Sequence, residues 1–413
     1  MRDPISPIAR SGAGVPMVPW AALAVLLALP LIVVRESWLL AYFAQAAAMI
    51  VFALSYNLLL GETGLLSFGH AAFAGLGAFV AAHLFNRGGI ALPWLPLAGG
   101  AAGAAFGLIF GLIATRRAGT AFAMITLGIG ELVAAAVWSL PEGFGGAAGV
   151  AIDRGAAPAF GIAFGPERQA YGLIASWAAL SIAAMFALTR TPLARMANAV
   201  RDNALRVAAL GIDPRRIRLA MFVFAAFFAG IAGTLTLIDV ELASSESVAM
   251  TRSGAVLIAT VIGGSATFFG PVIGALVLTG LSVALASVTR AWPVYLGLSF
   301  VGAVLWLPQG ISGWWARHRA RVRRYGARLL ALAYTLGAIA GAAWIGALVI
   351  GVESLYARRF AADAGGVWRI RSVAFDLGSP ATWTTLAMLA AIGAGAYAAL
   401  RLCLRRKEKA KQS

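Results

Sequence analysis

The feature that most constrains the fold is a series of long apolar runs separated by polar segments. One helix needs about 20 apolar residues to cross a bilayer, and most of the runs approach or reach this length. The chain is 61% hydrophobic and 12% charged, whereas soluble domains carry about 25% charged residues. We therefore expect an all-α, polytopic membrane protein with about 10–12 transmembrane or re-entrant helices. The runs are 18–34, 38–60, 67–84, 92–114, 119–140, 171–188, 219–238, 255–286, 292–307, 329–352 and 382–402.

The first run follows Arg2 and Arg10 and in this respect resembles a secretory signal peptide. No small-x-small cleavage site precedes Arg35, and the next apolar run follows at once. We interpret the first run as a retained span.

The segment 190–218 connects two apolar runs and contains two predicted helix starts. Thr191 is a typical N-cap and Pro192 suits the first helical position, where its missing N–H costs nothing. Asp213 and Pro214 repeat this pattern just before the next apolar run. The segment carries Arg190, Arg195, Arg201, Arg206, Arg215, Arg216 and Arg218.

The first of these helices is predicted to be amphipathic. Arg195, Asp202 and Arg206 share another face, with Asp202 four residues before Arg206 as a possible ion pair, and Gly211 suits the left-handed position after a helix. Such a helix beside a membrane is a candidate for docking another protein, although the arginines would equally well only fix the topology. The apolar positions at helical spacing are Leu193, Met196, Ala197, Val200, Ala204, Val207 and Ala208.

Charge bias assigns the connections to two sides of the membrane. The loops 141–170 and 239–254 carry three acids each and fewer arginines, so we place them outside; 316–328 is basic and belongs inside. This order requires 255–286 to enter the membrane and return, turning near Gly263-Gly264 to Gly270-Pro271. At least one limb would then be a partial helix, and broken helices often line a transport pathway.

No convincing catalytic or metal-binding set is present. One cysteine and three histidines leave no disulfide framework and no zinc set. No G-x-x-x-x-G-K-[ST] loop occurs, so any ATP hydrolysis would take place in a partner chain. Gly263-Gly264-Ser265 faintly resembles an intramembrane serine protease nucleophile, but no histidine on a nearby later span suits it. We expect no enzyme activity and no cofactor.

Two ionisable residues lie inside apolar runs. Glu131 would line a pathway, hold a helix bend while protonated, or lie near the interface if the span slides. His70 would be a proton relay or a hydrogen-bonded structural residue, and the second reading is favoured because no acid is near it in sequence.

A glycine ladder marks the run 92–114. Its members are four residues apart and line up on one helix face, which permits close approach of another span. We interpret it as a packing signal and not as a site. The ladder consists of Gly99, Gly103, Gly107 and Gly111.

Several motifs occur together in this order: LSYNLLLG at 54–61, TGLLSFGHAAF at 63–73, AFAMITL at 121–127, AVRDN at 199–203, AALG at 208–211, VIGG at 261–264 and FGPVIGA at 269–275. Over residues 20–315 they resemble the permease subunits of bacterial ABC importers for branched-chain amino acids, the LivM-type family. Glu62 stands where an uncharged residue is expected, FGGAAG at 144–149 replaces a more polar motif, and the spans after 320 lie outside the usual core.

The resemblance implies a heterodimer of two related permeases, each docking a cytoplasmic ATP-binding cassette ATPase and fed by a periplasmic binding protein. Residues 194–211 correspond to the coupling helix. The expected contacts with the ATPase are Arg195, Arg201, Asp202, Asn203, Arg206, Leu210 and Gly211. The expected pathway residues are Ser67, Phe68, Gly69, His70, Thr126, Glu131, Gly263 and Gly264.

The predicted function is import of branched-chain or similar small apolar amino acids across the bacterial inner membrane; the alternatives are a self-sufficient secondary transporter or channel, and more distantly an intramembrane enzyme. Scarce intramembrane acids disfavour ion-coupled transport. We expect a cytoplasmic N-terminus 1–17, a core 18–315 containing the loop 190–218, a basic linker 316–328, a two-helix hairpin 329–403 and a basic cytoplasmic tail 404–413.

Overall fold

The structure is a computed structural model that describes residues 17–409 except 157, 159–160, 162, 308, 315–317, 319–326, 361–367, 371–372 and 376–377. Most of the predicted segments 1–17 and 316–328, and the last residues of the predicted tail, lie outside the described residues. The chain forms two compact units, one comprising 1–281 with 302–312 and the other 282–301 with 313–413.

The first unit is a bundle of helices with one short pair of strands. Its helices are α1 (Met17–Val33), α2 (Ser37–Asn57), α3 (His70–Asn86), α4 (Leu95–Ala114), α5 (Thr120–Ser139), α6 (Pro141–Phe144), α7 (Glu167–Thr189), α8 (Pro192–Ala209), α9 (Pro214–Val240), α10 (Met250–Gly263) and most of α11 (Gly270–Val288). A π-helix η1 (Leu58–Thr63), 3-10 helices η2 (Leu92–Trp94) and η3 (Ser245–Val248), and strands β1 (Val150–Ala151) and β2 (Leu242–Ala243) complete it.

The second unit holds the helices beyond the predicted core. α14 (Ala327–Phe360) and α15 (Pro380–Lys409) lie side by side, and β3 (Trp368–Ile370) pairs antiparallel with β4 (Val373–Phe375). α12 (Trp292–Trp306) contributes residues to both units. Inside the second unit the carboxylate of Glu353 accepts hydrogen bonds from the hydroxyl groups of Thr289 at 2.5 Å and Tyr295 at 2.9 Å.

Among the described residues, nine helices are long and apolar enough to cross a membrane, which confirms the predicted all-α polytopic fold. α1, α3 and α10 are shorter, with 17, 17 and 14 residues. α15 continues to Lys409, so residues 404–409 of the predicted tail extend the last helix.

α9 is the central helix of the first unit and packs against α2, α3 and α4. The glycine ladder of α4 lies against it. A β-carbon at Gly103 would lie 2.4 Å from the carbonyl oxygen of Ala226, and one at Gly99 would lie 1.9 Å from the hydroxyl oxygen of Thr234. Only glycine permits the two backbones to come this close. The predicted packing role of the ladder is confirmed.

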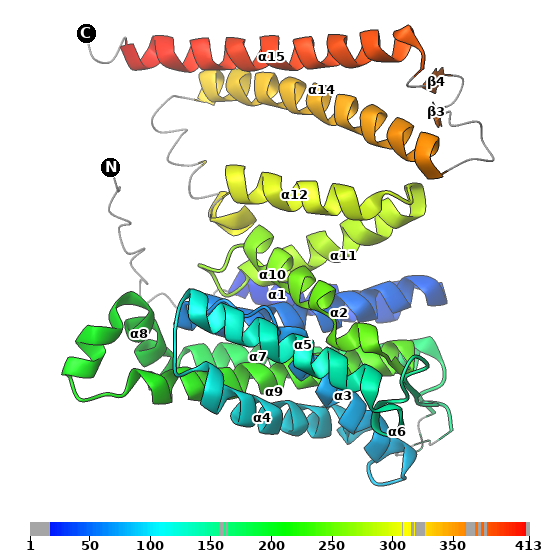
Figure 1. The fold of residues 1–413 in the computed structure, drawn as a ribbon, viewed down its shortest axis with the longest axis vertical. Helices are drawn as coiled ribbons and strands as arrows, with labels where there is room; N and C mark the ends of the chain where they lie inside the picture. The colour runs from blue at the N-terminus through cyan, green and yellow to red at the C-terminus, as the bar shows by residue number, and fades with distance from the viewer. Residues whose placement is uncertain are drawn as a thin grey trace. The chain divides into compact units, whose positions relative to one another are not determined.

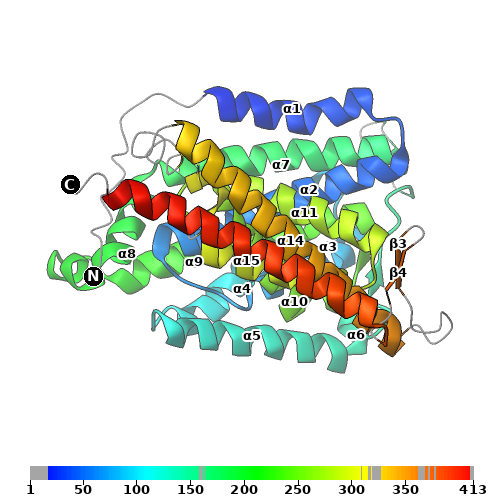
Figure 2. The same ribbon diagram turned by 90° about the horizontal axis from the view of Figure 1, so that it is seen from above.

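The first unit has two distinct ends, with α8 at one and α6 at the other (Figures 1 and 2). At the α6 end, β1 pairs with β2 and thereby joins the two loops that charge bias places on the same side. Arg154 connects the loop after β1 to α7 and to the end of α9. Its buried guanidinium contacts Glu167 and lies 3.0 Å from a carboxylate oxygen of Glu241. It also donates to the carbonyl oxygen of Ile238 at 3.0 Å.

α10 and α11 form the predicted break within 255–286. α10 ends at Gly263, six residues intervene, and α11 begins at Gly270. The limbs touch closely, because a β-carbon at Gly274 would lie 1.8 Å from the carbonyl oxygen of Ala259. The helices thus turn where the sequence predicted, and α10 is the short limb.

Candidate functional site

Both predicted helix starts in the segment 190–218 are confirmed. The Thr191 hydroxyl accepts from the backbone N–H of Ala194 at 3.4 Å, and the Asp213 carboxylate accepts from that of Arg215 at 2.9 Å. Each cap is followed by proline as the first helical residue. Gly211 has a φ of +82°, the left-handed conformation expected after a helix. Local side-chain chemistry therefore fixes where α8 begins and where α9 follows it.

α8 is bent at Asn203, which the sequence analysis did not predict. Asn203 has an extended backbone (φ −160°, ψ 94°), and its side-chain oxygen accepts from the backbone N–H of Arg206 at 3.0 Å, as an N-cap does. The bend removes the helical spacing between Asp202 and Arg206. Asp202 instead lies 3.2 Å from Nε of Arg201, so the predicted pair with Arg206 is wrong.

The part of α8 before the bend docks onto the helical bundle. The Asn198 amide donates to the carboxylate of Glu62, and the Arg201 guanidinium donates to the carbonyl oxygen of Gly61. Both acceptors belong to η1, the π-helix that follows α2. The predicted apolar face is confirmed in part: Ala197, Val200 and Val207 are buried, as is Ala194, which was not predicted, whereas Ala208 is exposed.

The part after the bend presents apolar and basic side chains to the surroundings. Leu205 is 84% exposed and Leu210 is 74% exposed, and Arg206 is exposed beside them. Leu205 was not predicted as a contact residue, because it lies outside the apolar stripe that packs inward. All the residues predicted to contact an ATPase are exposed: Arg195, Arg201, Asp202, Asn203, Arg206, Leu210 and Gly211.

The predicted pathway residues 67–70 lie against α5 at Thr126 and Gly130, and the predicted Glu131 is the next residue of that helix. The backbone N–H of Phe68 donates to the Thr126 hydroxyl at 3.2 Å. A β-carbon at Gly69 would lie 2.0 Å from the carbonyl oxygen of Thr126, so the loop before α3 lies directly on α5. Gly130 also takes part in this contact, because a β-carbon added at Gly130 would lie 3.0 Å from Cα of Gly69.

His70 is fully buried at the first position of α3. Its Nε2 lies 3.0 Å from the Ser55 hydroxyl, and its ring stacks on Phe52 with centroids 5.4 Å apart. Tyr56 meets the ring edge-on. These contacts support the structural reading of His70 over the proton relay.

The members of the meeting point differ in exposure. Ser67, Gly69, His70 and Thr126 are buried, Phe68 is half-buried, and Glu131 is exposed on α5. Within this group, therefore, Phe68 and Glu131 are the side chains that reach the surface of the chain. The buried members shape the backbone around them.

Gly263 and Gly264 lie apart from that meeting point, at the turn between α10 and α11. A β-carbon at Gly263 would lie 2.0 Å from the carbonyl oxygen of Gly270, and one at Gly264 would lie 2.4 Å from that of Gln309. Gly264 has a φ of +101°, which side chains other than hydrogen rarely tolerate. The two glycines thus make the turn possible, and both are buried.

Residues 38–308 match the family described as "Branched-chain amino acid transport system / permease component". The chain belongs to this family. Its members are membrane components of transport systems, so the protein is a multi-pass permease and not an enzyme by family.

Two proteins named "High-affinity branched-chain amino acid transport system permease protein LivM" are similar to the chain. The one from Escherichia coli (strain K12) is 30% identical over 286 residues, which cover 63% of this chain and 67% of the relative. The one from Salmonella typhimurium (strain LT2) is 30% identical over 315 residues, covering 70% and 73%. No solved structure matches the chain.

The family region contains α8, η1, the meeting point of 67–70 with 126–131, and the α10–α11 turn. α14 and α15 lie beyond it. The candidate sites of this permease are thus all in the region shared with the family.

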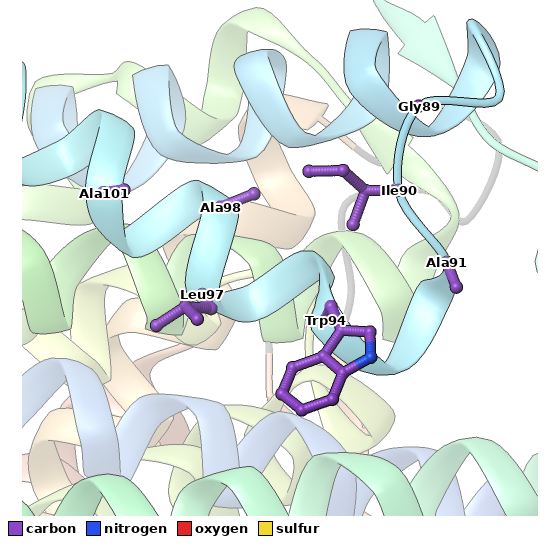
Figure 3. A pocket seen from close by; sticks show the side chains of 7 residues that line it. All are labelled: Gly89, Ile90, Ala91, Trp94, Leu97, Ala98 and Ala101. Atoms are coloured by element: carbon purple, nitrogen blue, oxygen red, sulfur yellow. The ribbon is translucent and has the colours of Figure 1, made fainter.

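A pocket of about 490 Å³ lies where α3 connects to α4. Figure 3 shows its lining: Gly89, Ile90, Ala91, Trp94, Leu97, Ala98 and Ala101. These side chains are apolar apart from the indole N–H of Trp94 and so give an amino acid's charged groups no partner. Nothing predicted to lie on the pathway lines this pocket.

Arg252 lies within the predicted loop 239–254, but the structure places it on α10. Its guanidinium donates to the Thr236 hydroxyl of α9 at 2.8 Å and lies over the Phe52 ring of α2, 5.8 Å from the centroid. The buried Arg154 was counted only for its charge. In both cases the contacts join segments far apart in sequence, which local patterns do not reveal.

Proposed function

We propose that this permease is the membrane-spanning subunit of an ATP-binding cassette importer that moves branched-chain or similar small apolar amino acids across the bacterial inner membrane. A separate ATPase subunit supplies the energy, a second related permease completes the translocation unit, and a periplasmic binding protein delivers the substrate. The family membership and the LivM relatives support this assignment.

The single observation that carries the proposal is the form of α8. This helix is capped at both ends, lies at one end of the bundle and makes its hydrogen bonds to η1 through its first part. Its second part leaves Leu205 and Leu210 exposed next to Arg206. Exposed leucines beside a basic residue on one helix form a surface that suits another protein better than water.

The distribution of arginines between the two ends of the first unit supports an orientation in the membrane. The α8 end carries the arginine-rich segment, whereas the opposite end carries the joined loops of β1 and β2. Positive residues gather on the cytoplasmic side of membrane proteins. We therefore place α8 and both termini in the cytoplasm, and the β1–β2 end in the periplasm.

The pathway in this proposal passes the junction of the loop 67–70 with α5. Phe68 and Glu131 line it, and the buried Ser67, Gly69, His70 and Thr126 hold its wall in shape. Gly263 and Gly264 contribute by letting α10 and α11 turn. Weak contacts along apolar helices leave substrate selection to the binding protein.

The test changes Leu205→Asp together with Arg206→Glu and recovers the tagged chain from its native membrane in mild detergent. Loss of such anchors commonly costs about 2 kcal/mol or more, which is about 30-fold in affinity. We expect recovery of the ATPase to fall accordingly, while the amount of chain in the membrane stays unchanged. Mass spectrometry of the recovered proteins measures both.

The matched control is Arg87→Glu, a charge reversal at an exposed position at the end of α3. It should leave ATPase recovery at the wild-type level. If the double variant also leaves it there, the arginine segment serves topology alone. If the wild-type chain comes without an ATPase and still transports after reconstitution, the protein is a secondary transporter.

A further inference from the structure

η1 lies between α8 and the turn that joins α10 to α11. α8 contacts η1 through Glu62 and Gly61. On its other side, a β-carbon at Gly61 would lie 2.7 Å from the carbonyl oxygen of Ser265, which is in the α10–α11 turn. One short segment therefore touches both the helix proposed to dock the ATPase and the hairpin of the predicted pathway.

The contact with α8 combines two charge-assisted hydrogen bonds. The Asn198 amide donates to the carboxylate of Glu62 and also to the carbonyl oxygen of Ala194 at 2.9 Å, so the amide is held on both sides. The guanidinium of Arg201 donates to Gly61. Bonds in which one partner is ionised are about twice as strong as neutral ones.

Gly64 lets the Arg201 side chain cross the end of η1. It adopts a φ of +69°, and a β-carbon at this position would lie 2.8 Å from Cγ of Arg201. Any other residue here would meet both a strained backbone and the arginine. The close fit leaves α8 little freedom to move without moving η1.

The space between η1 and the turn is equally tight. A β-carbon at Gly61 would lie 2.7 Å from the carbonyl oxygen of Ser265 in the turn, and 2.5 Å from the side-chain oxygen of Asn57 at the end of α2. Leu58, Leu59 and Thr63 are buried around it. η1 and the turn are thus in direct backbone contact at Gly61 and Ser265.

The π-helical geometry adds a physical reason for this position. A π-helix closes each turn with one residue more than an α-helix, is rare, and is found frequently at functional sites. In η1 the Thr63 hydroxyl and the backbone N–H of Leu65 both bond to the carbonyl oxygen of Leu59, at 2.6 and 2.9 Å. The π-helical turn that follows α2 is thus held by two hydrogen bonds to one carbonyl oxygen.

We propose that η1 is the joint that transmits movement of α8 to the α10–α11 turn, with Glu62 and Asn198 as the positioning residues that hold the joint to α8. This inference rests on the proposed function and assigns a role to Glu62, whose charge departs from the family pattern. The loop that follows η1 leads to Gly69, which lies on α5, so the same movement also reaches the wall of the pathway.

The test uses the full transporter, purified through a tag on this chain and reconstituted with its binding protein in liposomes. Radiolabelled leucine is the probe, and leucine transported per ATP hydrolysed is measured. Glu62→Ala and Asn198→Ala should each lower this ratio by about fivefold or more, the size of a typical coupling between two sites. ATPase recovery should remain unchanged, because the exposed part of α8 is intact.

Three further variants sharpen the test. Glu62→Gln keeps an acceptor oxygen for Asn198 but loses the charge, so it should restore the ratio in part. The double alanine variant should be no worse than either single one, because both remove the same contact. Asn86→Ala removes another amide that bonds across segments, to the carbonyl oxygen of Ala151 at the opposite end, and should leave the ratio unchanged.

An unchanged ratio in both alanine variants, with the ATPase still recovered, overturns the joint and leaves the proposed function standing. The proposal that η1 is a joint is also contradicted if Glu62→Gln behaves as Glu62→Ala. It is contradicted as well if both alanine variants are lost from the membrane, because the contact would then only support folding. Failure to recover an ATPase with the wild-type chain overturns the proposed function together with the joint.

Discussion

Glu131 is an exposed carboxylate on α5, one residue after Gly130, which packs on Gly69. A carboxylate facing the hydrocarbon interior costs about 3 kcal/mol, so such residues face water-filled cavities or other protein. The structure places no bend at this residue, since α5 is continuous from Thr120 to Ser139. For Glu131, these observations favour a place on the pathway over a role in holding a helix bend.

We expect Glu131→Gln to lower leucine uptake about tenfold, which corresponds to about 1.4 kcal/mol on the transport barrier. The substitution keeps the shape of the side chain but removes its charge, so the yield of folded chain should not change. Uptake by reconstituted transporter measures the effect. Glu142→Gln, on the exposed α6, is the control, and wild-type uptake by the Glu131 variant would return Glu131 to a structural role.

The contact of α4 with α9 shows what glycine provides at the scale of two elements. Gly77 of α3, Gly99 of α4 and Gly230 of α9 converge, since a β-carbon at Gly230 would lie 2.2 Å from the carbonyl oxygen of Gly99 and one at Gly77 would lie 2.7 Å from Cα of Gly230. Dispersion contacts between backbones replace side-chain packing here. In the proposal, η1 and α8 move relative to these closely packed helices.

Gly103→Ala should destabilise the protein, because its β-carbon meets the backbone oxygen of Ala226 at 2.4 Å. Overpacking of this kind typically costs about 1–3 kcal/mol. Gly128→Ala on α5 is the matched control, since nothing lies within 4 Å of its β-carbon, and the gain in helix propensity should make it neutral or slightly stabilising. Thermal unfolding in detergent compares the two, and an equal effect on both would rule out close α4–α9 packing.

The first unit has two ends, which the proposal assigns to opposite sides of the membrane. Cys403 is the single cysteine of the chain, so a Cys403→Ala background allows single cysteines to be placed at will. We expect Arg206→Cys to react with a membrane-impermeant maleimide only from the cytoplasmic side, and Arg87→Cys only from the periplasmic side. Labelling of both from one side would contradict the assignment.

A third position in the same background tests the hairpin. Ser265 lies in the α10–α11 turn, half-buried, with its carbonyl oxygen beside Gly61. Ser265→Cys should label poorly from the cytoplasm if the turn stays within the membrane. Ready labelling would mean that both limbs cross completely.

The sequence alone determined the features that depend on neighbours a few residues apart. Apolar runs long enough to cross a bilayer predicted the polytopic fold, and charge bias with glycine and proline predicted the break between Gly263 and Gly270. The caps at Thr191 and Asp213 were predictable because a cap acts within one helical turn. The motifs also predicted the family, which the comparison confirmed.

Only the tertiary structure decided which surfaces meet. The glycine ladder predicted a close helix contact but did not identify α9 as the partner. The sequence likewise showed the charge of Arg201 but not its hydrogen bond to Gly61, 140 residues away in sequence. The bend at Asn203 carries its own local cap, but only the structure shows that α8 contacts η1 before the bend and exposes Leu205 after it. Such contacts arise from the packing of whole helices, whose energy is spread over many residues, and a local pattern carries no record of the partner.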